Sequence, residues 1–261
     1  VGRAAECAPR LIDFSWGDAG APRVTLVGKG VCFDSGGLDI KAAPGMLLMK
    51  KDMGGAACVL ALARVIMESA LPVRLRVLVP AVENSIAGNA YRPGDVLRTR
   101  KGITVEVGNT DAEGRLVLSD ALAAADADDP QLLVDMATLT GAARVALGPE
   151  LPALFGSRTD TVEALLRHGR VHADPLWPMP LWDGYEDEIA SKVADVGNVS
   201  ASAFAGAVIG GLFLRRFVSP QRDWLHVDLY AWNGKERPGR AVGGEPQAVR
   251  ALYALLVERF G

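Results

Sequence analysis

Short apolar runs rich in valine and leucine alternate along this chain with longer segments whose apolar residues have helical spacing. Four of these runs, residues 24–30, 73–84, 131–139 and 224–232, are expected to be strands. Parallel strands need long crossover connections, and helices between strands supply them on both faces of a sheet. The alternation therefore predicts an α/β fold with a mixed, largely parallel β-sheet sandwiched by helices on both faces.

The segments between these strands give the expected helices and loops. Residues 31–53 are rich in glycine, proline and charge and are expected to be a loop, while residues 103–107 form a further short strand. The expected helices are 54–69, 115–128, 140–147, 161–170, 206–217 and 246–260. No repeat or linker divides the chain, so residues 1–261 are expected to form a single domain.

The composition argues against several classes of protein. The formal net charge is −3, without the clustered excess of lysine and arginine that a nucleic-acid surface needs. Glycines interrupt the longest apolar stretch, around residues 201–214, and it is too short to favour a membrane span. The three cysteines, Cys7, Cys32 and Cys58, are too widely spaced for a CxxC site and indicate a reducing compartment. We therefore expect a cytoplasmic protein with neither a membrane nor a nucleic-acid partner.

Two glycine-rich segments, residues 28–55 and 108–115, carry an unusual concentration of charge beside apolar strands. Carboxylates in apolar surroundings are very costly unless a metal ion or a cation neutralises them. Four carboxylates, some of them bridging, suit a pair of divalent ions roughly 3.5–4 Å apart. The charged residues of interest in the two segments are Lys29, Asp34, Lys41, Asp52, Asp111, Glu113 and Arg115.

The same two segments resemble the cytosol (leucyl) aminopeptidase family, whose members are di-zinc enzymes. NTDAEGRL at residues 109–116 matches the family's most specific signature, and VGKGVCFDSGG, followed by MKKDMGGAA, matches a second block. The resemblance covers nearly the whole chain and corresponds to the catalytic C-terminal domain. It implies that this chain lacks the smaller N-terminal domain and the front of the catalytic domain. Further matching segments are MATLTGA (136–142), MPLWDGY (179–185), SKVADVGN (191–198) and WLHVD (224–228).

The resemblance implies a complete set of metal ligands. Asp34 and Glu113 would bridge two zinc ions, Lys29 and Asp52 would complete the tighter site, and Asp111 would serve the more exchangeable one. Manganese or another divalent ion also suits the exchangeable site. A lysine can bind a metal only as the neutral amine, so metal binding must displace its proton.

The resemblance also implies two catalytic residues that are not ligands. The substrate would be a peptide with a free N-terminus, attacked by a water acidified by both metals. Lys41 would stabilise the developing oxyanion, and Arg115 would hold a bicarbonate that acts as general base. The family assembles into homo-hexamers, which the resemblance implies for the full-length form.

A pocket for the first substrate side chain follows from the same resemblance. Its expected lining residues are Met49, Thr138, Leu139 and Gly141, and this apolar rim suits leucine and similar residues. Discrimination would be loose, because one methylene in such a pocket is worth about 1–3 kcal/mol. Tyr230 and Trp232 stand where relatives often have small residues, and they are large enough to reshape the pocket.

Plain structural alternatives exist for these residues. Acids such as Asp111 and Glu113 are also common at helix N-termini, and Asp52 could cap a helix. Lysines such as Lys29 and Lys41 are usually exposed on the surface. Met49 and Thr138 could simply pack in a core. FDSGGL is similar to the nucleophile motif of serine proteases, but no histidine stands in a supporting context. A different class of function is an inactive or truncated relative acting as a scaffold or DNA-associated assembly protein. The intact set of seven charged residues favours the enzyme.

Overall fold

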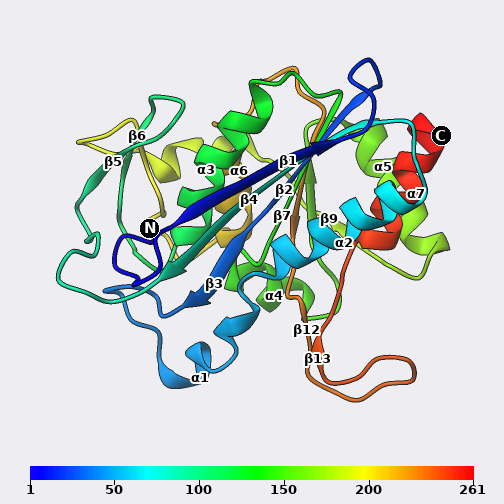
Figure 1. Ribbon diagram of the computed structural model, residues 1–261. Helices are drawn as coiled ribbons and strands as arrows, with labels where there is room; N and C mark the ends of the chain where they lie inside the picture. Colours follow the sequence, from blue (N-terminus) through cyan, green and yellow to red (C-terminus); the bar gives the residue numbers. More distant parts are fainter.

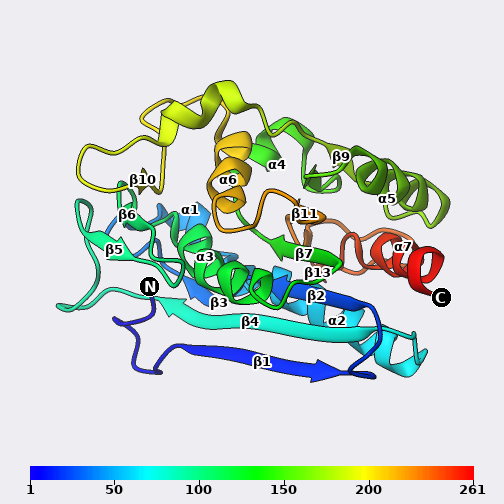
Figure 2. The same ribbon diagram turned by 90° about the horizontal axis from the view of Figure 1, so that it is seen from above.

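The computed structural model describes residues 1–261 and is built around an eight-stranded sheet (Figure 1). Its strands are β1 (Arg10–Trp16), β2 (Arg23–Gly28), β3 (Gly30–Asp34), β4 (Arg74–Asn84), β7 (Leu132–Ala137), β8 (Ala153–Gly156), β9 (Trp177–Pro178) and β11 (Trp224–Asp228). Their order is β1-β4-β2-β7-β11-β8-β9, and β3 pairs with β4 beyond the end of β2. The central strands β4, β2, β7 and β11 are parallel, whereas β1 is antiparallel to β4 and β8 is antiparallel to β11, which confirms the predicted mixed, largely parallel sheet (Figure 2).

The remaining elements surround this sheet. Two small sheets contain β5 (Val96–Arg98), β6 (Thr104–Glu106) and β10 (Val196–Gly197), and β12 (Trp232–Asn233) with β13 (Gly243–Gly244). The α-helices are α1 (Ala43–Met46), α2 (Gly54–Glu68), α3 (Glu113–Asp126), α4 (Gly141–Leu147), α5 (Thr159–Val171), α6 (Gly206–Arg215) and α7 (Val249–Phe260). Two 3-10 helices are η1 (Met49–Lys51) and η2 (Asp183–Ile189). None of the helices combines the length and the hydropathy needed to cross a membrane.

Helices cover both faces of the main sheet. One core of 28 buried residues joins the sheet to α2, α5 and α7, and a second of 21 joins the opposite face to α3 and α6 (Figure 1). Successive strand residues point to opposite faces, so Leu26 lies in the first core and Val27 in the second. This confirms the predicted sandwich of helices around the sheet.

The length of β4 sets the position of the charged residues. This strand pairs with β2 over residues 74–78 and then with β3 over residues 81–84. Lys29 lies at the junction of β2 and β3, where its N–H donates to the Met136 carbonyl over 3.0 Å. Gly28 permits the close approach of α2, because a Cβ there would lie 2.7 Å from the Ala56 Cα.

The structure corrects several sequence predictions. Residues 31–34 were expected in a loop but belong to β3, because β4 continues past β2 and offers them backbone partners. The predicted strand 224–232 ends at Asp228, and Ala231 has a positive φ of 56°, which no strand tolerates. Strands β1 and β8 lie at or near the edges of the sheet and were not predicted, since their short runs carry weak periodicity.

The packing of α2 predicts a clear contrast between two leucines. Leu62 is fully buried in the larger core, whereas Leu60 on the same helix is 41% exposed. Leu62→Ala should lower the free energy of unfolding by about 2–5 kcal/mol, because it leaves a cavity. Leu60→Ala, the matched control, should change it by less than about 1 kcal/mol. Denaturant titration measures both values, and equal losses would contradict this placement of α2.

Candidate metal centre

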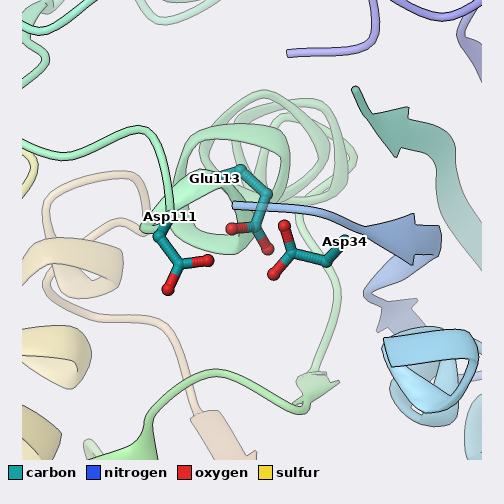
Figure 3. A group of neighbouring side chains, drawn as sticks. All are labelled: Asp34, Asp111 and Glu113. Atoms are coloured by element: carbon teal, nitrogen blue, oxygen red, sulfur yellow. The ribbon is translucent and has the colours of Figure 1, made fainter. Parts of the chain in front are cut away.

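Three carboxylates converge where β3, the turn before α3 and the first turn of α3 meet. Asp34 ends β3, Asp111 lies in the turn, and Glu113 is the first residue of α3. One oxygen atom of each carboxylate lies within 4.8 Å of the other two, and Figure 3 shows the three groups facing a shared space. Asp52, which follows η1, joins the cluster through Lys29.

Two lysine ammonium groups lie between these acids. Lys29 Nζ lies 2.9 Å from Asp52 Oδ2 and 2.7 Å from Glu113 Oε1. Lys41 Nζ lies 2.8 Å from Asp34 Oδ2 and 2.5 Å from Asp111 Oδ1. The side chains of Lys29 and Lys41 are 3% and 15% exposed, so the interpretation as surface lysines is wrong for both.

The approach of the two predicted segments depends on glycine. A Cβ at Gly114 would lie 2.7 Å from Lys29 Nζ, so any larger residue would displace the lysine. Asp52 does not cap α2, whose N-cap is Met53 without a side-chain hydrogen bond. Its Oδ1 instead accepts a hydrogen bond of 2.7 Å from Thr138 Oγ1. The cap interpretation of Asp52 is therefore wrong.

The cluster carries more negative charge than its lysines neutralise. Burial raises the pKa of Glu113 to about 7 and that of Asp111 to about 6, against the opposing effect of the lysines. Glu113 Oε2 is buried and has no hydrogen-bond partner. Such a set of carboxylates fits divalent metal ions, which supply the missing positive charge and accept oxygen ligands.

Lys29 also fits the cluster, with one chemical condition. Burial disfavours its ammonium form, but the charges of Asp52, Glu113 and Asp34 outweigh burial and raise its pKa. The amine would become a ligand only if a metal ion took over the neutralisation of these acids and displaced the proton.

Residues that the sequence analysis did not identify hold the carboxylates in place. Asn84 Nδ2 donates to Asp34 Oδ1 over 2.8 Å and to the Thr110 carbonyl over 3.1 Å, and Tyr91 Oη donates to the same carbonyl over 2.6 Å. Asn84 joins the two charged segments directly. A polar residue at the carboxyl end of a buried strand was the available signal for it.

Arg115 lies close to the cluster without an acidic partner. Its guanidinium is buried, donates to the Asn198 carbonyl over 2.5 Å and lies 5.9 Å from the ring centroid of Phe213. Burial lowers its pKa to about 10, so it stays charged at neutral pH. Its remaining N–H donors make it suited to an anion.

A cleft of about 370 Å³ opens onto the cluster. Four of the predicted ligands line it, namely Lys29, Asp34, Asp52 and Asp111, and so does Lys41. All four predicted pocket residues line it too, namely Met49, Thr138, Leu139 and Gly141. Glu113 and Arg115 do not line it. The structure thus brings the metal-type residues and the predicted pocket residues to one cavity.

The cleft also contains residues that the sequence analysis did not single out. Lys51 and Arg144 line it together with Tyr230, while Trp232 lines a separate hollow with Lys50. Tyr230 therefore reaches the predicted pocket, and Trp232 does not. Burial lowers the pKa of Lys51 to about 8, so most of this side chain is protonated at neutral pH.

The raised pKa of Glu113 predicts how the chelator-treated protein responds to pH. A carboxyl whose pKa rises on folding from 4.5 to about 7 stabilises the fold below pH 4.5, and that contribution is lost as the pH rises through 7. Glu113→Gln should remove this loss, so its stability relative to the unchanged protein should improve by on the order of 1–3 kcal/mol between these limits. Urea unfolding of both proteins across the range measures the difference, and parallel curves would contradict the prediction.

Comparison with known proteins identifies relatives over almost the whole chain. The model of the cytosol aminopeptidase family, catalytic domain, matches residues 1–253. A probable cytosol aminopeptidase of Xanthomonas oryzae pv. oryzae is 46% identical over 256 residues, which cover 98% of this chain and 52% of the relative. The chain therefore spans about half the length of the curated relatives it matches.

Solved structures give the same result. The crystal structure of a cytosol aminopeptidase from Coxiella burnetii matches with a TM-score of 0.98 and 57% identity, covering 100% of this chain and 57% of that one. The bottromycin maturation enzyme BotP in complex with Mn matches with a TM-score of 0.95 and 37% identity, covering 100% of this chain and 58% of that one. Fold, charged cluster and sequence agree, and the chain belongs to the cytosol aminopeptidase family, where it corresponds to the catalytic domain.

Proposed function

We propose that the chain is the catalytic part of a metal-dependent aminopeptidase that hydrolyses the first peptide bond of peptides with a free N-terminus. The observation that carries the proposal is the convergence of Asp34, Asp52, Asp111, Glu113 and two lysines in one cluster that opens onto a cleft. Family membership supports it. Because the matched relatives are about twice as long, the activity of the whole protein is part of the proposal.

Two divalent ions would be held by the five predicted ligands. Asp34 and Glu113 would contribute to both sites, Lys29 and Asp52 to the tighter one, and Asp111 to the exchangeable one. Zinc is the proposed resident metal, and manganese or another divalent ion also suits the exchangeable site. The structure of BotP in complex with Mn supports manganese as one of these ions. When bound, such a pair acidifies a water and polarises a carbonyl.

The residues of the chain would carry the remaining steps. Lys41, which contacts Asp34 and Asp111 at the cleft, would donate a hydrogen bond to the oxyanion that forms as the peptide carbonyl is attacked. Arg115 would hold a bicarbonate that accepts the proton of the water, a role that its buried and acid-free guanidinium supports.

The substrate side of the proposal rests on the cleft. Met49, Thr138, Leu139 and Gly141 would contact the first side chain, which favours leucine and similar apolar residues. We further propose that residues 1–261 fold as one catalytic unit, that the full-length protein is a cytoplasmic homo-hexamer, and that it has no nucleic-acid partner. The retained ligand-type residues argue against the alternative of an inactive scaffold or DNA-associated assembly protein.

Release of leucine from leucyl amide tests the proposal. Turnover should stop after treatment with a chelator and return with Zn²⁺ or Mn²⁺. Lys41→Ala should keep the metal and lower kcat by roughly 10²- to 10³-fold, because it removes one oxyanion donor. Asp52→Ala and Glu113→Ala should lose metal and activity together.

Metal analysis of each purified variant provides the control for this experiment. Loss of metal from Lys41→Ala would contradict its assigned role, because that role does not include ligation. Full activity of the chelated protein would contradict the metal-dependent reaction itself.

A further inference from the structure

Lys51 is a buried cation without a direct ion-pair partner. It ends η1 next to Asp52, is only 8% exposed and has neither an ion-pair nor a hydrogen-bond partner. Its ammonium lies 4.4 Å from the ring centroid of Tyr230 and lines the cleft. A buried ammonium without a direct ion pair is costly, and the net effect of its surroundings on Lys51 disfavours its charged form although the charges of Asp52 and Asp228 act on it. Its position therefore favours a ligand that brings a carboxylate into direct contact.

Arg144 brings a second free cation to the same place. This residue of α4 lines the cleft, forms no ion pair, and its guanidinium carbon lies 5.3 Å from the Tyr230 ring centroid. Lys51 and Arg144 therefore flank one aromatic ring from two different elements. An ammonium and a planar guanidinium that share a cavity make a carboxylate-binding pair.

The acids nearest to this pair are engaged elsewhere. Asp228 accepts hydrogen bonds from the backbone N–H groups of Leu139 and Thr140 and from the Thr140 hydroxyl. Asp52 pairs with Lys29 and accepts from Thr138. Neither carboxylate forms an ion pair with Lys51 or Arg144, although the charges of Asp52 and Asp228 favour the charged form of Lys51 from a distance. The N–H donors of both cations therefore remain available to a molecule in the cleft.

We propose that Lys51 and Arg144 bind a carboxylate of the substrate, so that the enzyme accepts peptides with an N-terminal glutamate or aspartate in addition to apolar residues. The proposal rests on the proposed aminopeptidase function. Lys51 and Arg144 line the same cavity as Met49, Thr138 and Leu139, which are proposed to contact the first side chain. The C-terminal carboxylate of a dipeptide has the same chemistry and is the other possible source.

The test compares substrates of equal shape and different charge. The ratio of kcat/KM for glutamyl amide to that for glutaminyl amide reports on a side-chain carboxylate, and the ratio for Leu-Gly to that for Leu-Gly amide reports on a C-terminal one. Lys51→Met should lower the first ratio by roughly tenfold to a hundredfold, because a charge-assisted hydrogen bond is lost. Lys51→Arg should restore most of it. A fall in the second ratio alone would assign the pair to a C-terminal carboxylate and overturn the preference for an N-terminal acid.

Lys50→Met is the matched control. Lys50 is the neighbouring lysine, is exposed, and lies over Trp232 outside this cleft, so its removal should leave both ratios unchanged. A structural disturbance of Asp52 would lower the rates of paired substrates alike and would not move the ratio. Arg144→Gln, on the exposed side of α4, repeats the test if Lys51→Met fails to fold.

The outcomes separate this proposal from the proposed function. Turnover of leucyl amide with both ratios unaffected by Lys51→Met and Arg144→Gln would overturn the carboxylate site and leave the aminopeptidase intact. If leucyl amide is not hydrolysed with any metal, the carboxylate site can still be tested by measuring the binding of L-glutamate and of L-glutamine by calorimetry. Tighter binding of glutamate that Lys51→Met abolishes supports the site, and equal binding overturns it.

Discussion

The pairing of the buried Lys29 and the half-buried Lys41 with four carboxylates is the interaction on which the rest of the site depends. Lys29 joins Asp52 to Glu113, and Lys41 joins Asp34 to Asp111, so each ammonium links acids from different segments of the chain. Removing one partner from a buried pair such as Lys29–Glu113 typically costs about 3–5 kcal/mol, because an unpaired buried charge remains. The same concentration of acids that requires the lysines is what makes the cluster suitable for divalent ions.

The sheet makes this cluster possible by ending several parallel strands at one edge. Strand β4 extends beyond the end of β2 and pairs there with β3, which places Asp34 beside Asn84. Asn84 also bonds to the Thr110 carbonyl, so both residues lie beside the turn that carries Asp111. The cleft that results has acids and lysines at one part of its wall and two unpaired cations, Lys51 and Arg144, at another. Under the proposed function, chemistry and selectivity would be assigned to separate groups of residues within one cavity.

Much of this arrangement could be predicted from the sequence. The parallel sheet followed from β-branched runs between helical segments, and the charged residues followed from acids on glycine-rich segments beside apolar strands. Asn84 was marked only by its place at the carboxyl end of a predicted strand, and Arg144 had no local signal, because their roles arise from contacts across the fold. In the sequence, Lys51 does not differ from the other charged residues of its segment. Only the structure distinguishes it, because its side chain is buried without an ion-pair partner. Strand β3 was missed because its pairing depends on the distant β4.

Equilibrium dialysis of the chelator-treated chain against Zn²⁺ or Mn²⁺ tests the central claim most directly. On metal binding, the metal ions would take over the neutralisation of the acids from the Lys29 ammonium, which would lose its proton. The account predicts two bound ions per chain, release of protons on binding, and a loss of binding in Asp34→Asn, which replaces a proposed bridging ligand. Binding of no ion, or binding that Asp34→Asn leaves unchanged, would contradict it.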